Sequence, residues 1–159
     1  MNSELLPYLK VAKPKEDHEF LNGIKQDEND FKNLKVEVKQ IIPNWVKSML
    51  IDFEIASLIL DFNSRNDEQI SIQFNSFKLI EGACLNMYPG CAIFKHGYIG
   101  IGEDPTGSGD PYFIKTDEGD NPPVYQIYHD VSDKGEEILK HGKELIANKF
   151  SDIFKNQTK

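Results

Sequence analysis

The amino-acid sequence predicts a single α+β domain, in which a twisted, mainly antiparallel sheet has N-terminal and C-terminal helices packed against it. Apolar residues recur at helical spacing near both ends of the chain and alternate with polar residues in its middle. The connections between the alternating segments are short and rich in turn residues, which favours antiparallel neighbours because parallel strands need crossovers of about a dozen residues or more. A length of 159 residues suits one hydrophobic core, so we expect one domain.

The first part of the chain is predicted to be an extension of the domain. Residues 1–28 are mostly polar and are interrupted by Pro7, Pro14 and Gly23, which indicates loop structure over much of this segment. We therefore place the domain itself at residues 29–159.

The first segment of the predicted domain, residues 29–42, fits two patterns. Its apolar residues at helical spacing are Phe31, Leu34, Val38 and Ile41. Its apolar residues in strand alternation are Leu34, Val36 and Val38. We favour a helix, with Asn29 or Asp30 as its N-cap.

Pro43 is expected to begin a second helix, because proline suits the first helical turn and restricts the residue before it. Apolar residues then recur three or four positions apart, at Val46, Met49, Leu50, Phe53, Ala56 and Leu60. This helix is predicted to end near Asn63, where the polar sequence NSRND indicates a turn.

The middle of the chain is predicted to form the sheet. Residues 69–74 alternate between polar and apolar side chains, as a half-buried strand does. Further strands are predicted at residues 77–81, at 92–94 continuing past a turn at 96–97 into 98–102, at 112–115 and at 124–129.

A final helical stretch follows Asp133, which is a candidate N-cap with Glu136 three positions later. Its apolar residues at helical spacing are Ile138, Leu139, Leu145, Ile146, Phe150, Ile153 and Phe154. Gly142 is expected to break or bend this element.

Acidic residues are concentrated in one segment. Residues 101–133 contain eight acidic residues and one basic residue, so this segment carries −7 of the formal net charge of −8. If its loops lie on one face, they project a negative field that attracts basic proteins and repels nucleic acid. The candidate partner-binding residues are Glu103, Asp104, Asp117, Glu118, Asp120, Asp130 and Asp133.

A glycine-rich loop lies within this acidic segment. It is not a phosphate loop, because Ser108 stands where that motif requires lysine and the neighbouring carboxylates repel anions. Asp104 and Gly109 fit the first and sixth positions of a calcium loop, but Lys115 stands at the twelfth position, where such a loop has glutamate. We therefore expect no dedicated calcium site, and only adventitious calcium binding stays an alternative. We interpret Gly109 and Asp110 as a structural turn, with glycine supplying the backbone freedom and aspartate a cap. No cofactor is predicted.

The sequence also predicts neither a metal site nor a catalytic group. Cys84 and Cys91 are spaced more widely than the pairs of common zinc sites, and we interpret both as small buried thiols. His129 follows an apolar strand, which favours a hydrogen-bonded structural histidine. Ser108 does not lie in the G-x-S-x-G motif of hydrolases. We therefore expect a protein that is not an enzyme.

The composition also bears on the compartment. No apolar run approaches the roughly 20 residues that a membrane helix requires. The N-terminal sequence MNSELLPYLK lacks the basic-then-apolar layout of a signal peptide. We therefore expect a soluble, cytoplasmic protein that binds no membrane.

Three motifs follow one another along the chain. Ile42-Pro43 precedes an amphipathic helix, and residues 97–114 contain a strand, a small acidic loop, Gly109-Asp110 and a second strand. Residues 123–130 form another strand, which is followed by the terminal sequence LIANKFSDIF. In this order the motifs resemble the SUKH superfamily, which groups fungal cell-wall synthesis regulators of the Smi/Knr type with many bacterial immunity proteins. The resemblance covers about 115 residues.

This resemblance implies a Smi/Knr-like fold without catalytic residues. In bacterial members of the superfamily it implies neutralisation of toxins, which are often nucleases. We therefore expect an immunity protein whose acidic surface binds a basic toxin domain. The alternative is a regulatory or scaffold protein of the cell-wall synthesis regulator type.

Overall fold

Six strands form one sheet within residues 1–12 and 22–158, which are the residues that the computed structural model describes. The strands are β1 (Ile59–Asn63), β2 (Gln69–Phe74), β3 (Tyr98–Glu103), β4 (Tyr112–Lys115), β5 (Val124–Ile127) and β6 (Lys143–Ala147). They lie side by side in sequence order, and each strand is antiparallel to its neighbours.

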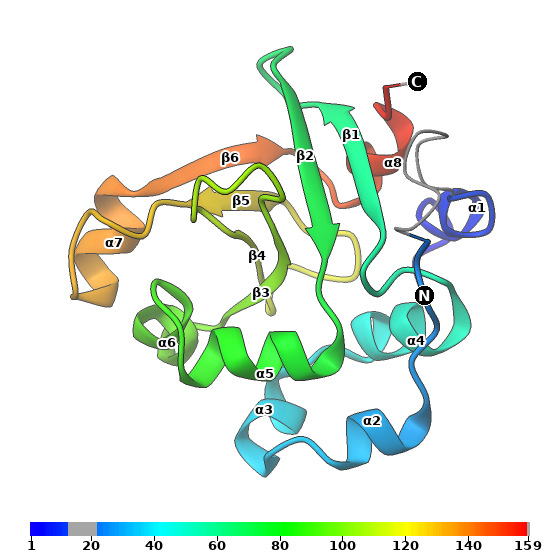
Figure 1. Ribbon diagram of the computed structural model, residues 1–159, viewed down its shortest axis with the longest axis horizontal. Coiled ribbons are helices and arrows are strands. Elements are labelled where there is room, and N and C mark those ends of the chain that lie inside the picture. The colour runs from blue at the N-terminus through cyan, green and yellow to red at the C-terminus, as the bar shows by residue number, and fades with distance from the viewer. Residues whose placement is uncertain (13–21, 159) are drawn as a thin grey trace.

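The sheet curls so strongly that its two edges, at β1 and β6, approach each other. In Figure 1, β1 and β2 lie at a steep angle to β5 and β6. The backbone N–H of Arg65, in the β1–β2 turn, donates to the carbonyl oxygen of Ile146 in β6 at 2.8 Å. The outer edge of β1 is covered as well, because the Thr158 N–H donates to the Asp61 carbonyl oxygen at 2.9 Å. Such coverage blocks edge-to-edge pairing with other chains.

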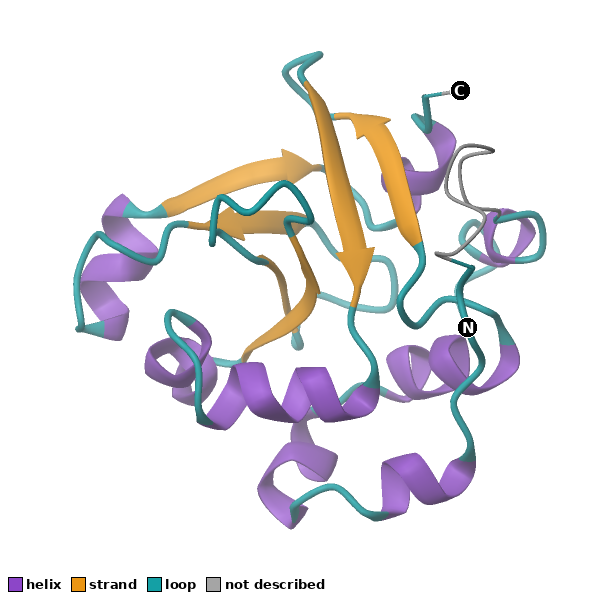
Figure 2. Ribbon diagram, viewed as in Figure 1, coloured by secondary structure: helices purple, strands orange, loops and turns teal. Residues whose placement is uncertain are grey.

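Helices surround the curled sheet. They are α1 (Leu6–Leu9), α2 (Glu28–Lys32), α3 (Val36–Ile41), α4 (Asn44–Asp52), α5 (Phe77–Leu85), α6 (Gly90–Ile93), the 3₁₀ turn η2 (Phe94–His96), α7 (Gly135–His141) and α8 (Ser151–Lys155). In the view of Figures 1 and 2, α2 to α5 lie below the sheet, α6 and α7 lie at its left, and α1 and α8 lie at its right.

Two hydrophobic clusters fill the interior. In the larger one, Trp45 of α4 packs edge-on against Phe150 with ring centroids 5.0 Å apart, and Phe74 stacks on Phe154 at 5.6 Å. The smaller cluster consists of Ile93, Tyr98, Phe113, Ile127 and Ile138, and it connects α6 and α7 with β3 to β5. The predicted α+β class, with an antiparallel sheet and helices packed against it, is confirmed.

The described N-terminal residues pack against the rest of the domain. Leu5 and Leu9 are 0% and 3% exposed and belong to the larger cluster. The Lys149 ammonium lies 2.8 Å from the Glu4 carboxylate, which joins the N-terminal segment to the turn before α8. The segment that we predicted to be an extension therefore contributes to the core, although residues 13–21 lie outside the described residues.

The helix predicted from Pro43 to near Asn63 is wrong beyond Asp52. The chain turns after α4, and Ser57 adopts a positive φ of 68°. The apolar residues 58–60 fit either a helix or a buried strand, because short apolar runs satisfy both patterns. Pairing with β2, which lies later in the chain, makes this segment β1.

Two predicted strands are helical. Residues 77–81 belong to α5, which begins after Ser76, whose hydroxyl oxygen accepts the Leu79 N–H at 3.3 Å. This serine N-cap is the local signal that our strand prediction overlooked. Residues 92–94 are helical as well, since they lie at the end of α6 and the start of η2. The strand predicted at 98–102 is confirmed as β3.

The C-terminal helix is interrupted by a strand. Gly142 ends α7, as predicted, but residues 143–147 form β6, so the prediction of helix there is wrong. Pairing with β5 outweighs the helical spacing of the apolar residues. Asp133 does not cap α7, because Lys134 occupies the N-cap position and its N–H donates to the Ser132 hydroxyl at 3.1 Å.

The helix predicted at residues 29–42 is two short helices, α2 and α3. Asp27, and not Asn29 or Asp30, is the N-cap of α2. The carboxylates of Asp27 and Asp30 each accept the other residue's backbone N–H at 2.9 Å, which forms a capping box. The predicted strands β2, β4 and β5 are confirmed, although β5 ends at Ile127.

Candidate functional site

The acidic residues of segment 101–133 divide between opposite ends of the sheet. Because β4 is antiparallel to both β3 and β5, the loop 104–111 before it and the loop 116–123 after it lie at its two ends. We call the end at which β4 begins the first end, and the end at which it finishes the second end. The candidates at the first end are Glu103, Asp104, Asp130 and Asp133. Those at the second end are Asp117, Glu118 and Asp120. The acidic residues therefore do not share a single face.

At the second end, the acidic side chains have partners within the chain. Asp117 forms an ion pair with Lys115 at 3.3 Å, and that hydrogen bond raises the pKa of the lysine. Glu118 accepts the Tyr125 hydroxyl at 3.1 Å, and burial together with this carboxylate raises the pKa of Tyr125 to about 12. Asp120 accepts from the side-chain amide of Asn2 at 3.2 Å. These contacts assign local structural roles to the three carboxylates.

At the first end, Asp104 and Glu103 differ in their surroundings. Partial burial acts to raise the pKa of Asp104, but hydrogen bonds from Ser108 and Thr106 outweigh it and lower this pKa. The Thr106 N–H and hydroxyl both donate to the Asp104 carboxylate, at 2.8 and 2.6 Å. Burial raises the pKa of Glu103. Asp104 thus stabilises its own turn, and Glu103 is half-buried.

The contact between Asp110 and His129 joins two loops at this end. One carboxylate oxygen of Asp110 accepts the His129 backbone N–H at 3.1 Å and lies 2.8 Å from its Nδ1. This hydrogen bond raises the pKa of the imidazole. Gly109 has a positive φ of 79°, and its Cα faces the imidazole so closely that a Cβ would lie 3.2 Å from the ring. The predicted turn residues therefore hold the loop 104–111 against the loop after β5.

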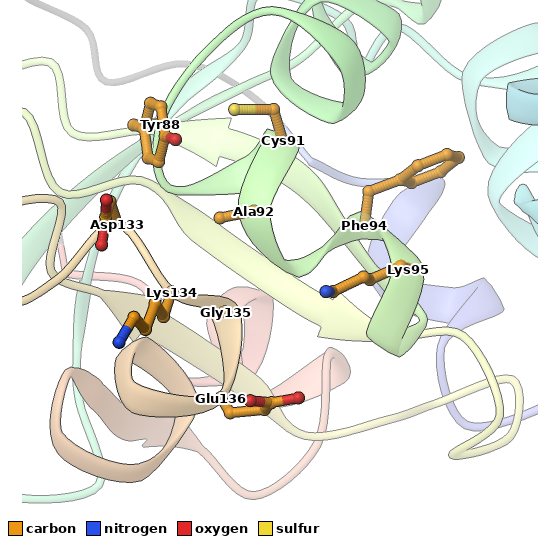
Figure 3. A pocket seen from close by; sticks show the side chains of 9 residues that line it. All are labelled: Tyr88, Cys91, Ala92, Phe94, Lys95, Asp133, Lys134, Gly135 and Glu136. Atoms are coloured by element: carbon orange, nitrogen blue, oxygen red, sulfur yellow. The ribbon is translucent and has the colours of Figure 1, made fainter.

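A groove lies beside this joined pair of loops. It consists of two adjoining cavities, of about 390 and 450 Å³, which share Tyr88 and Asp133 in their lining. The first, shown in Figure 3, is lined by Tyr88, Cys91, Ala92, Phe94, Lys95, Asp133, Lys134, Gly135 and Glu136. The second is lined by Tyr88, His129, Asp130, Ser132 and Asp133. We call the two together the Tyr88 groove.

Close backbone contacts position the walls of the Tyr88 groove. A Cβ on Gly90 would lie 2.2 Å from the carbonyl oxygen of Ala83, so α6 lies directly against α5. A Cβ on Gly135 would lie 2.2 Å from the carbonyl oxygen of Ala92, so α7 lies equally close to α6. The smaller hydrophobic cluster supports these helices from beneath. The groove is therefore built on packed helices and not on loops alone.

The Tyr88 groove exposes apolar surface. Tyr88 is 55% exposed, its neighbour Met87 is 43% exposed, and Val131, between two lining residues, is 39% exposed. Tyr88 was not among the residues predicted from the sequence, because the groove forms only when the α5–α6 connection meets the loop before α7. An exposed tyrosine beside charged groups is typical of protein interfaces.

Two carboxylates at the groove are available to a partner. Within the described part of the chain, neither Asp130 nor Asp133 accepts a hydrogen bond or forms an ion pair. The loop that carries them is held in place, because the Ser132 hydroxyl donates to the Glu137 carboxylate at 2.6 Å and accepts the Lys134 N–H at 3.1 Å. Lys95, Lys134 and Glu136 line the other cavity, whereas the cavity near His129 carries Asp130 and Asp133 with His129 as the one basic residue in its described lining.

The described residues contain no group of three or more histidine, cysteine, aspartate or glutamate side chains arranged to hold a metal ion. In the loop 104–111, Asp104 is engaged by Thr106 and Asp110 by His129. Cys84 is buried, as predicted, and this burial raises the pKa of its thiol to about 12. Cys91 is only partly buried and lines the groove, which corrects our interpretation of it as a buried thiol.

Comparisons of the chain with protein-family models, with curated proteins and with solved structures find no match. The resemblance to the SUKH superfamily therefore stays a prediction from sequence motifs. A search of the described helices finds none that combines the length and apolar character needed to cross a membrane.

Proposed function

We propose that this chain is a non-catalytic protein-binding domain that neutralises a toxin, and that it binds the toxin at the Tyr88 groove. The observation that carries the proposal is the groove itself, where an exposed tyrosine lies beside Asp130 and Asp133. The toxin class, a bacterial nuclease acting in the cytoplasm, comes from the motif resemblance. The chain would then be an immunity protein.

The chemistry of the groove fits such a partner. Tyrosine supplies a large, stiff contact area and is enriched among the residues that dominate binding energy. Nucleases bind polyanions through lysine and arginine, so their substrate-binding surface is basic. An acidic surface that covers those residues would attract the enzyme electrostatically and block access to the nucleic acid.

The first end of the sheet suits this role better than the second. The carboxylates of Asp117, Glu118 and Asp120 already have partners within the chain. A partner that binds there would share or replace those contacts, which would reduce its net gain in free energy. Asp130 and Asp133 require no such exchange, because the described residues offer them no hydrogen bond.

The proposal is tested by identifying the partner and then by measuring protection. The tagged chain is used to capture proteins from lysate of its own source at low and at high salt, and the bound proteins are identified by mass spectrometry. A basic protein retained at low salt is then expressed in cells with and without the chain. We expect that protein to arrest growth and the wild-type chain to restore it.

Two matched variants locate the surface. Asp130→Asn/Asp133→Asn and Asp117→Asn/Asp120→Asn each remove two negative charges, from opposite ends of the sheet. We expect the first pair to lose protection and the second pair to keep it. A captured protein that arrests no growth, or equal protection by both variants, would contradict the proposal.

A further inference from the structure

We propose that the cavity lined by Tyr88, His129, Asp130, Ser132 and Asp133 binds an arginine side chain of the protein partner. This inference rests on the proposed function, because it specifies which chemical group of a basic partner occupies the Tyr88 groove. The cavity, of about 450 Å³, is shallow and open to solvent, so a side chain bound there would stay partly exposed.

The tyrosine provides the first recognition element. Tyr88 is 55% exposed and lines both cavities of the groove, so it is accessible to a ligand. A cation placed over an aromatic face is attracted by the negative potential of the ring. The planar guanidinium of arginine can also stack on the ring, which the compact ammonium of lysine does less well.

The carboxylates of Asp130 and Asp133 provide the second element. Asp130 and Asp133 lie on either side of Ser132 in the sequence, and all three line the cavity with Tyr88. A guanidinium carries five N–H donors in one plane and can bind more than one carboxylate oxygen at once. Figure 3 shows Asp133 and Tyr88 on the same side of the neighbouring cavity, although they come from different segments. A stacked guanidinium at Tyr88 would therefore be near a carboxylate.

The surrounding charges favour a cation over an anion. His129 is the only basic side chain that lines this cavity within the described residues, and its Nδ1 lies 2.8 Å from the Asp110 carboxylate, which offsets its charge. A phosphate or carboxylate ligand would meet Asp130 and Asp133 instead of a donor. A bare metal ion is also disfavoured, since the described residues contain no metal-binding group of acidic, cysteine or histidine side chains.

The test uses the full-length, isotope-labelled chain and three small probes: N-acetyl-arginine methylamide, its neutral citrulline analogue and the lysine analogue. Binding is followed by the chemical shifts of the backbone amides. We expect the arginine probe to bind with a dissociation constant on the order of millimolar and to shift the amides of Tyr88, Asp130 and Asp133. The citrulline probe should cause no such shifts, and the lysine probe should bind about two- to fivefold more weakly.

Variants separate the two recognition elements. Tyr88→Ala should weaken arginine binding about two- to fivefold, whereas Tyr88→Phe should retain it, because the ring face and not the hydroxyl makes the contact. Asp130→Asn/Asp133→Asn should abolish the shifts, and Asp117→Asn/Asp120→Asn should leave them unchanged. Equal shifts with arginine and citrulline, or shifts centred on the second end of the sheet, would overturn the arginine site.

Failure of this inference is distinguishable from failure of the proposed function. A chain that protects cells from its toxin but shows no arginine-dependent shifts would overturn the arginine site and leave the proposed function intact. A chain that binds the arginine probe at Tyr88 but protects against no captured protein would overturn the toxin-neutralising function and support the site.

Discussion

The contact between Asp110 and His129 joins two loops that are far apart in the sequence. Its geometry, with the imidazole Nδ1 2.8 Å from the carboxylate, stabilises the charged form of the histidine and so raises its pKa. The acidic groups around the imidazole are Asp110, which makes the hydrogen bond, and Asp130, which acts through its charge. Folding therefore increases proton affinity at this position.

This coupling predicts a pH-dependent contribution to stability. Because the folded pKa of His129 lies above its ordinary value of 6.5, the contribution is fully present below pH 6.5 and is lost as the pH rises through the folded pKa. We expect His129→Gln to lower the free energy of unfolding more at about pH 5.5 than at about pH 8.5. Urea denaturation at the two pH values measures this difference.

The control for the pH experiment is Asp110→Asn, which removes the carboxylate that lies 2.8 Å from the His129 Nδ1. In this background, the effect of His129→Gln should differ less between the two pH values. For His129→Gln in the wild-type chain, an equal decrease in the free energy of unfolding at both pH values would show that the contact between Asp110 and His129 does not stabilise the charged imidazole.

The walls of the Tyr88 groove depend on how closely α5, α6 and α7 approach one another. At Gly90, the backbone of α6 meets the carbonyl of Ala83 in α5, and the gap admits no side chain. Gly82, in the interior of α5, faces open space, with no atom within 4 Å of where its Cβ would be. Both glycines lie in helices, but close packing requires glycine only at position 90.

We predict opposite effects for the two alanine substitutions. Gly90→Ala should destabilise the protein by about 1–3 kcal/mol, because the new methyl group forces α6 away from α5. Gly82→Ala should stabilise it by about 0.5–1 kcal/mol, because alanine favours the helix and restricts the unfolded chain. Chemical denaturation of both variants gives these values, and a stable Gly90→Ala protein would show that the close packing beside the groove is not required.

Prediction from sequence succeeded for elements with an unambiguous local pattern. β2 alternates polar and apolar residues, and β4 and β5 are bounded by turn residues, so these strands were placed correctly. β1 and β6 were predicted as helix because their apolar residues fit both spacings. Their strand partners, β2 and β5, decide the outcome, and a local pattern contains no information about pairing.

The charge distribution of the whole molecule was predicted only in part. The sequence located the acidic segment, but the strand order divides its carboxylates between two ends of the sheet. Tyr88 was not predicted as a site residue at all, because its cavity is created by segments that meet only in the folded chain. The sequence therefore predicted which charged residues are present, but it did not predict how the fold arranges them.

Binding of a basic protein at the Tyr88 groove is the basis of the proposed function. It is tested most directly by the association rate of the captured partner with the wild-type chain and the two charge variants over a range of salt concentrations. Electrostatic steering raises association rates at low salt and is screened at high salt. We expect Asp130→Asn/Asp133→Asn to slow association and to flatten its salt dependence, and we expect Asp117→Asn/Asp120→Asn to resemble the wild type. Equal effects of the two variants, or a larger effect of the second, would contradict it.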